Sequence, residues 1–174
     1  MSLIDNTPIN RNFLSPLNFK FTIKKAPNVN FFIQKVNIPS VTLGAPVSNN
    51  PFVKIPYPGD HLEYGELSIT FKVDEDLQNY LEIFNWITSL GKPQSWQQRA
   101  DIQAIASYTG DGVYSDISVI ALNSKKNANY ETVYVDAFPV NISPVVFNTT
   151  DTDVDYISAS ATFKYTYFTI AKIV

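Results

Sequence analysis

The sequence contains no cysteine and only one histidine, His61, among its 174 residues. Without cysteine the chain has no disulfide framework, no thiolate metal site and no cysteine nucleophile, so its stability must come from packing and association. A Ser-His-Asp triad would need His61 as its base. His61 follows the turn sequence Pro58-Gly59-Asp60 and is expected to be a solvated loop residue. We therefore expect a non-enzymatic protein without cofactor or metal.

Long hydrophobic runs and an excess of one charge are also missing. No stretch approaches the length of a membrane span, and residues 1–8 lack the basic residues and apolar run of a signal peptide. We expect a soluble protein made in a cytoplasm, with no membrane partner. Thirteen basic and sixteen acidic residues give a formal charge of −3. Such a weakly acidic chain has no electrostatic footprint for specific nucleic-acid binding.

The abundant residues point to a sheet. The chain has twelve Phe, ten Tyr and eleven Pro but a single Met. Aromatic residues suit the half-buried surface of a strand, and proline is frequent at turns and sheet edges. The length allows one good core, so residues 1–174 are predicted to form a single domain.

Alternation of apolar and polar residues predicts the strands. It is clearest at 67–73, where Leu67, Ile69 and Phe71 alternate with polar residues. Similar patterns predict strands at 18–24, 31–38, 114–122, 131–138 and 155–168. The turn Ala26-Pro27-Asn28 predicts that the first two of these form a hairpin, and residues 123–129 predict a second hairpin.

One amphipathic helix is predicted at about residues 75–90. Asp74 is its expected N-cap, and Gly91 and Pro93 are expected to stop it. Its apolar face is predicted from Leu77, Leu81, Phe84, Ile87 and Leu90, which recur at helical spacing. Together the patterns predict a mainly β fold, a sandwich or barrel of about six to seven antiparallel strands with this one helix. Residues 92–112 are ambiguous.

Two segments are predicted to lie outside the regular core. Residues 1–16 show no period and contain two prolines, which predicts an extended N-terminal arm. Residues 41–60 form a long loop or hairpin in which prolines confine the apolar stretch 51–57 to an edge or an excursion. A connection of this length is a candidate for contact with a partner.

Other candidate sites have ordinary structural explanations. Asp151, Asp153 and Asp155 resemble the start of a calcium loop, but Tyr156 stands where the loop needs glycine, so a solvated acidic turn is expected. Trp86 is expected in the core. Trp96 could be exposed, and it raises the alternative of a carbohydrate platform.

Five segments carry a resemblance to a known family. They are LNFKF at 17–21, FIQKVNIP at 32–39, VKIPYPGD at 53–60, ELSITFKVDED at 66–76 and AFPVNIS at 137–143. In order and spacing, together with Phe84 and Trp86 on the helix and the closing strand with Phe163, Tyr165 and Tyr167, they resemble the tail tube proteins of contractile bacteriophages over most of residues 17–168.

This resemblance implies a structural subunit. Subunits would close into a ring, usually a hexamer, and stacked rings would form the inner tube of the tail, a template for the sheath and a conduit for DNA that it does not bind specifically. The other implied partners are the baseplate tube-initiator and the tape measure protein. The implied location is the virion tail, assembled in the bacterial host cytoplasm.

By the same resemblance, the loop 41–60 should reach a neighbouring subunit or ring. Its expected apolar anchors are Pro51, Phe52, Val53, Ile55, Tyr57 and Pro58. Three alternatives stay open: a tube initiator or terminator, the tube of a phage-derived injection or secretion system, and a monomeric carbohydrate-binding β-sandwich.

Overall fold

The structure, a computed structural model, describes residues 12–93, 95–104, 112–150 and 156–173. Within these residues the strands are β1 (Phe19–Ile23), β2 (Ile33–Val36), β3 (Val41–Leu43), β4 (Val47–Asn49), β5 (Lys54–Pro56), β6 (Leu62–Tyr64), β7 (Leu67–Lys72), β8 (Ser115–Leu122), β9 (Ala128–Ile142), β10 (Ser158–Lys164) and β11 (Tyr167–Lys172). The helices are α1 (Pro27–Phe32), α2 (Gln78–Gly91) and α3 (Trp96–Ala104). The predicted mainly β class is confirmed.

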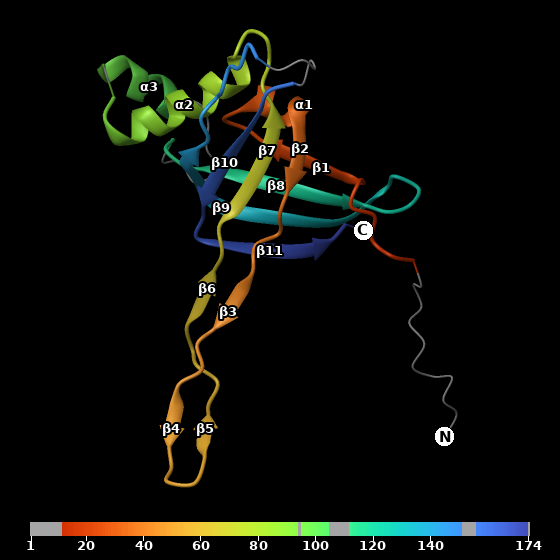
Figure 1. Ribbon diagram of the computed structural model, residues 1–174, viewed down its shortest axis with the longest axis vertical. Coiled ribbons are helices and arrows are strands. Elements are labelled where there is room, and N and C mark those ends of the chain that lie inside the picture. Colours follow the sequence, from red (N-terminus) through yellow and green to blue (C-terminus); the bar gives the residue numbers. More distant parts are fainter. Residues whose placement is uncertain (1–11, 94, 105–111, 151–155, 174) are drawn as a thin grey trace.

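Seven strands form the body of the molecule. Their hydrogen-bonded order is β1-β8-β9-β10-β7-β2, and β11 pairs with β9 as well. Every pairing is antiparallel. The remaining four strands form two small two-stranded sheets, β3-β6 and β4-β5, which extend away from the body (Figure 1).

The long strand β9 joins the two halves of this sheet. Its first part pairs with β8 and β11, and its last part pairs with β10. Thr132 and Tyr134 are buried in the first part, whereas Ala137 and Pro139 are buried in the second, so the inward face changes from even to odd positions. The change occurs at Asp136, which has a φ of 55°. A bulge there shifts the phase by one residue and keeps both parts facing the core.

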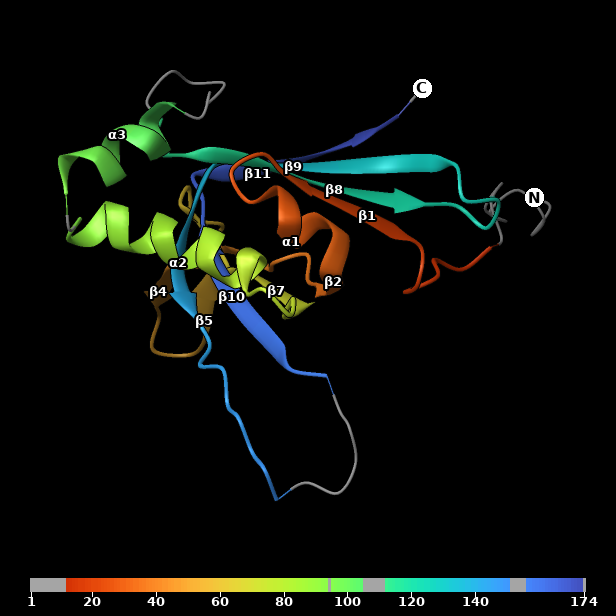
Figure 2. The same cartoon turned by 90° about the horizontal axis from the view of Figure 1, so that it is seen from above.

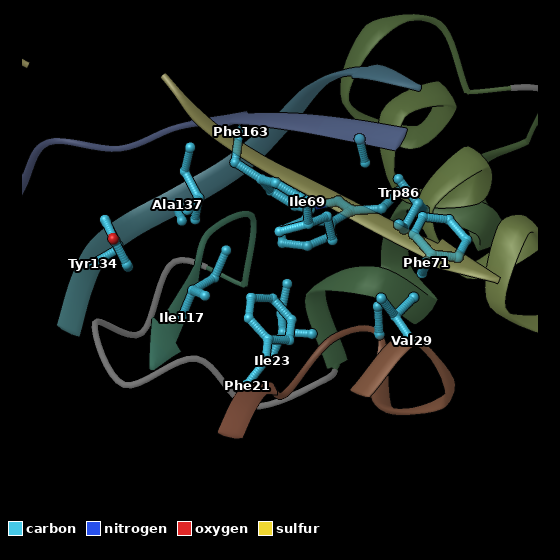
Figure 3. Packing of buried hydrophobic residues seen from close by; sticks show 14 of the residues in the cluster. Phe21, Ile23, Val29, Ile69, Phe71, Trp86, Ile117, Tyr134, Ala137 and Phe163 are labelled. Carbon is cyan, nitrogen blue, oxygen red and sulfur yellow. The ribbon is translucent and has the colours of Figure 1, made fainter. Parts of the chain in front are cut away.

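The core lies between the sheet and α2. Trp86 is 1% exposed, its ring lies 6.1 Å from that of Phe163, and its indole nitrogen donates to the Val113 carbonyl at 3.0 Å. Figure 3 shows Trp86 close to Phe71 and Ile69. Figure 2 shows α1 and α2 on the same side of β1, β8 and β9. The expectation that Trp86 belongs to the core is confirmed.

The helix α2 begins later than predicted, at Gln78, and Asp74 does not cap it. Leu77 occupies the N-cap position with a φ of 57°. The side chain of Asn79 bonds the segment before the helix, because its amide donates to the Lys72 carbonyl at 2.8 Å and its oxygen accepts from the Asp74 N–H at 3.2 Å. Asn79 is fully buried and fixes the connection between β7 and α2.

The predicted apolar face of this helix was partly wrong. Leu81 and Phe84 are exposed, and the buried positions are Asn79, Ile83, Trp86 and Ser89. The apolar residues cover more than one face, so helical spacing alone included the exposed Leu81 and Phe84 and missed the buried Ile83. Ile87 and Leu90 do pack against the core.

The first predicted hairpin is wrong, because the short helix α1 separates β1 from β2 and the two strands do not pair. Instead β1 pairs with β8, and β2 pairs with β7. Proline at the first helical position and the Asn30 side chain, which bonds both backbone groups of Ile23, favour a helix over a turn. The second hairpin, between β8 and β9, is confirmed.

The closing strand is broken into β10 and β11, which both run along β9. The predicted acidic turn with Asp151, Asp153 and Asp155 lies outside the described residues, as do residues 1–11 of the predicted N-terminal arm. Residues 95–104 of the ambiguous stretch contain α3.

The conformation of Asp136 gives a test of the bulge. Asn and Asp tolerate a positive φ far better than a β-branched residue does. We expect Asp136→Val to lower the free energy of unfolding by about 1–2 kcal/mol more than Asp136→Asn, measured by urea denaturation. Equal losses for the two variants would contradict this account of β9.

Candidate assembly surface

The most prominent surface feature is the projecting hairpin, residues 41–64. Near the body β3 pairs with β6, with Val41 opposite Tyr64 and Leu43 opposite Leu62. Further out β4 pairs with β5, with Val47 opposite Pro56 and Ser48 opposite Ile55. Figure 1 shows both pairs in line, extending well beyond the seven-stranded body.

The six residues predicted as interface anchors all lie at the outer part of this hairpin, and all are exposed. They are Pro51, Phe52, Val53, Ile55, Tyr57 and Pro58. Phe52 at the tip is 95% exposed. Residues 41–59 contain one charged side chain, Lys54. An exposed surface this apolar and this poor in charge is typical of a site that another protein covers.

Further apolar residues of the hairpin were missed as candidates. Val41, Leu43, Val47 and Leu62 are also exposed. Residues directly opposite each other share a face, so Leu43 and Leu62 form an apolar pair near the body, whereas Val47 and Ile55 lie on opposite faces of the outer ribbon. The short alternations VTL and LEY carried this signal, but three residues are too few to predict a strand.

The root of the hairpin is fixed to the body by an aromatic cluster. Tyr64 of β6 lies 5.6 Å from Phe168 and 6.1 Å from Tyr165, measured between ring centroids. Tyr134 of β9 completes the cluster at 5.0 Å from Tyr165. The Tyr165 hydroxyl donates to the Gly65 carbonyl at 2.7 Å. Burial raises the pKa of Tyr165, with a smaller contribution from Tyr64, so this donor stays protonated well above neutral pH.

A second set of bonds holds the other side of the root. The Asn37 side chain accepts from the Ser68 N–H at 2.6 Å and donates to the Glu66 carbonyl at 3.2 Å. The Gly65 N–H donates to the Ser40 carbonyl at 2.9 Å. The hairpin is therefore anchored at its root and not along its length.

Two glycines join the inner and outer pairs of strands. The Gly59 N–H donates to the Gly44 carbonyl at 2.7 Å, and a Cβ on Gly59 would lie 2.3 Å from that same oxygen. Only glycine allows the two backbones to approach this closely. The Gly44 and Gly59 pair therefore keeps the hairpin continuous between its two ribbons.

The outer hairpin cannot owe its order to its own core. A two-stranded ribbon in water is at best marginally stable, and residues 41–58 are exposed throughout. Full burial of one Val, Leu, Ile or Phe side chain contributes about 1.5–3 kcal/mol. Contact with a partner would therefore stabilise this hairpin strongly.

We also searched the described part of the chain for a metal site, a membrane-spanning helix and candidate binding residues. No group of three His, Asp or Glu residues there could hold a metal ion. Among the same residues no helix is long and apolar enough to cross a membrane. His61 is exposed at the side of the projecting hairpin. Trp96 is 91% exposed, and its sequence neighbours Ser95 and Gln97 line a hollow with polar walls.

Fold and surface together define a mainly β protein with a projecting, exposed apolar hairpin. The phage tail tube protein family matches residues 5–171 of the sequence, so the chain belongs to that family. The expected family is therefore confirmed, and it is a structural one.

Solved structures share the fold at low sequence identity. A chain from the structure of the tube-terminating cap of the anti-feeding prophage matches with 12% identity and a TM-score of 0.63, covering 99% of this chain and 100% of that one. A chain from the sheath-tube complex of PVC, an extracellular contractile injection system, matches with 11% identity, a TM-score of 0.60 and 94% coverage of both chains.

A chain from the PVC sheath/tube terminator structure has 13% identity and a TM-score of 0.59, covering 93% of this chain and 99% of that one. No curated protein matches the sequence significantly.

The glycine contact gives a test of the hairpin geometry. Gly59→Ala would strain the hairpin, and a strain of about 1 kcal/mol raises the locally open population roughly fivefold. We expect trypsin to cleave after Lys54 correspondingly faster, with an unchanged urea midpoint. Gly91→Ala is the matched control, because a Cβ there meets no atom within 4 Å. Equal cleavage of the two variants would contradict the role of Gly59.

Proposed function

We propose that this protein is a tube subunit that assembles into stacked hexameric rings and so forms the inner tube of a contractile phage tail. Its contribution is geometric, and no residue is catalytic. The observation that carries the proposal is the projecting hairpin, whose apolar residues 51–58 find no cover in their own chain. Family membership supplies the kind of assembly that such a hairpin would serve.

The proposed partners follow from this role. The first is the chain itself, within and between rings. The others are the tail sheath protein, for which the tube is a template, and the baseplate tube-initiator. The tape measure protein and DNA would occupy the lumen without specific binding. A subunit with a formal charge of −3 repels phosphate and lets DNA slide. Assembly would take place in the bacterial host cytoplasm, and the tube would remain in the virion tail.

A tube terminator is the second candidate. The chain of the tube-terminating cap matches this protein over the full length of both chains, with a TM-score close to that of the sheath-tube chain. The copy number in purified particles separates the two functions. A tube subunit is present in many rings per particle, whereas a terminator is present at one end. A baseplate tube-initiator would also be present at one end, whereas the tube subunit of an injection system would be present in many rings, as in a phage tail.

Removal of the tip aromatic tests the proposed interface. We expect Phe52→Ser to raise the concentration needed for assembly roughly ten- to hundredfold, because each intersubunit contact loses a buried phenyl ring. Light scattering across protein concentration, with electron microscopy of the products, measures this. The urea midpoint should not change, because Phe52 makes no core contact in its own chain.

The matched control is Phe147→Ser, which removes another exposed phenylalanine outside the hairpin and should leave assembly unchanged. Assembly of Phe52→Ser at the parental concentration would contradict the proposed interface. A strictly monomeric parent protein that binds glycans and that initiator complexes fail to polymerise would favour the carbohydrate-binding alternative instead.

A further inference from the structure

An apolar groove lies where the two ends of the seven-stranded sheet approach each other. β1 and β2 are the terminal strands of the sheet order, and both contribute residues to the groove. Its volume is about 290 Å³. The apolar lining comes from β1, β2, β8 and the segments next to them: Leu14, Phe19, Val36, Ile38, Val119 and Ala121.

The groove differs in character from the larger hollow beside the turn between β8 and β9. That hollow, of about 590 Å³, has a mixed lining, in which the polar Asn12, Ser15, Asn123, Ser124, Lys125 and Asn129 stand beside Phe13, Leu14, Leu122 and Tyr130. An apolar side chain entering it would leave polar groups without water or partners. Of these two hollows in the described part of the chain, the groove is the one that combines an apolar floor with the two strands at the ends of the sheet order.

The chain itself carries a segment of matching chemistry. The tip of the projecting hairpin presents Pro51, Phe52 and Val53, which are uncharged and exposed. The tip cannot enter the groove of its own chain. Ile38 in the groove is next to the root of the hairpin, whereas eleven residues of extended chain between Val41 and Phe52 span roughly 36 Å. Figure 1 shows the hairpin running straight away from the body.

We infer that the groove between β1 and β2 receives the hairpin tip of a second copy of this chain, with the Phe52 ring seated on the apolar floor. This contact joins two different surfaces of the molecule. Repeated from copy to copy, such a contact closes into a ring or continues as an open filament. The inference rests on the proposed function and assigns the receiving surface for the proposed hairpin interface.

Site-specific crosslinking tests the contact, and the absence of native cysteine makes each introduced thiol unique. Ser48→Cys is placed on the hairpin and Gln34→Cys at the rim of the groove, in separate chains that are mixed before assembly. A short bismaleimide crosslinker is then added. The control mixture pairs Ser48→Cys with Gln97→Cys on α3, outside the groove. We expect about tenfold more crosslinked dimer from the first mixture.

A second variant tests the groove without touching the hairpin. Ala121→Trp would fill the groove, and we expect it to raise the concentration needed for assembly at least about tenfold. Ala100→Trp on the exposed face of α3 is the matched control and should assemble normally. Circular dichroism and the urea midpoint establish whether Ala121→Trp is folded, and the crosslinking result stands independently if it is not.

The outcomes separate the inference from the proposed function. If the parent protein assembles but Ser48→Cys crosslinks no better to Gln34→Cys than to Gln97→Cys, the groove is not the receiving surface and the tube function stands. If the parent protein remains monomeric even with initiator complexes, both the function and the inference fail. Preferential crosslinking to Gln34→Cys in assembled particles establishes the groove as the receiving surface.

Discussion

The strand β9 is the element on which the rest of the structure depends. It pairs with β8 and β11 at one end and with β10 at the other, so every strand of the body except the terminal strand β2 is joined to it directly or through one neighbouring strand. Both parts of this long strand face the core only because the inward-facing positions shift by one residue between them. The bulge at Asp136 provides that shift. Tyr134, just before the bulge, then joins the aromatic cluster that holds the root of the hairpin.

The hairpin is held to the body at its root, and its outer ribbon is exposed. A two-stranded ribbon that is apolar, almost uncharged and exposed on both faces is a poor arrangement for an isolated molecule. The same ribbon becomes favourable when another copy covers it, because the apolar area is then removed from water and the entropy of ordering the ribbon is offset. The groove at the ends of the sheet offers a surface of suitable chemistry. A fixed projection and a separate receptive groove on the same molecule are what an assembly that adds copy after copy needs.

The sequence allowed the fold class and the family to be predicted, and it placed the apolar residues within 51–58 on a surface excursion. Strict alternation worked where one face is buried, as at Leu67–Lys72. It failed where contacts between residues far apart in the sequence decide the local structure. The segment that forms α1 was predicted as a turn, but this helix is stabilised partly by Asn30 and by Glu82 of α2, which accepts from Asn28. The bulge at Asp136 carries no strong local signal. The inner hairpin residues were missed because their strands are three residues long, and the groove depends on strands that are far apart in sequence.

Amide hydrogen exchange across residues 41–64, compared between monomeric and assembled protein, tests the central claim most directly. The account predicts fast exchange in the outer ribbon of the monomer, since a solvated two-stranded pair opens readily. It predicts strong protection of the same amides after assembly, with little change in the amides of β7 and α2. Equal protection of residues 41–64 in both states would show that the hairpin is stable alone and does not need a second copy. That result would contradict the account.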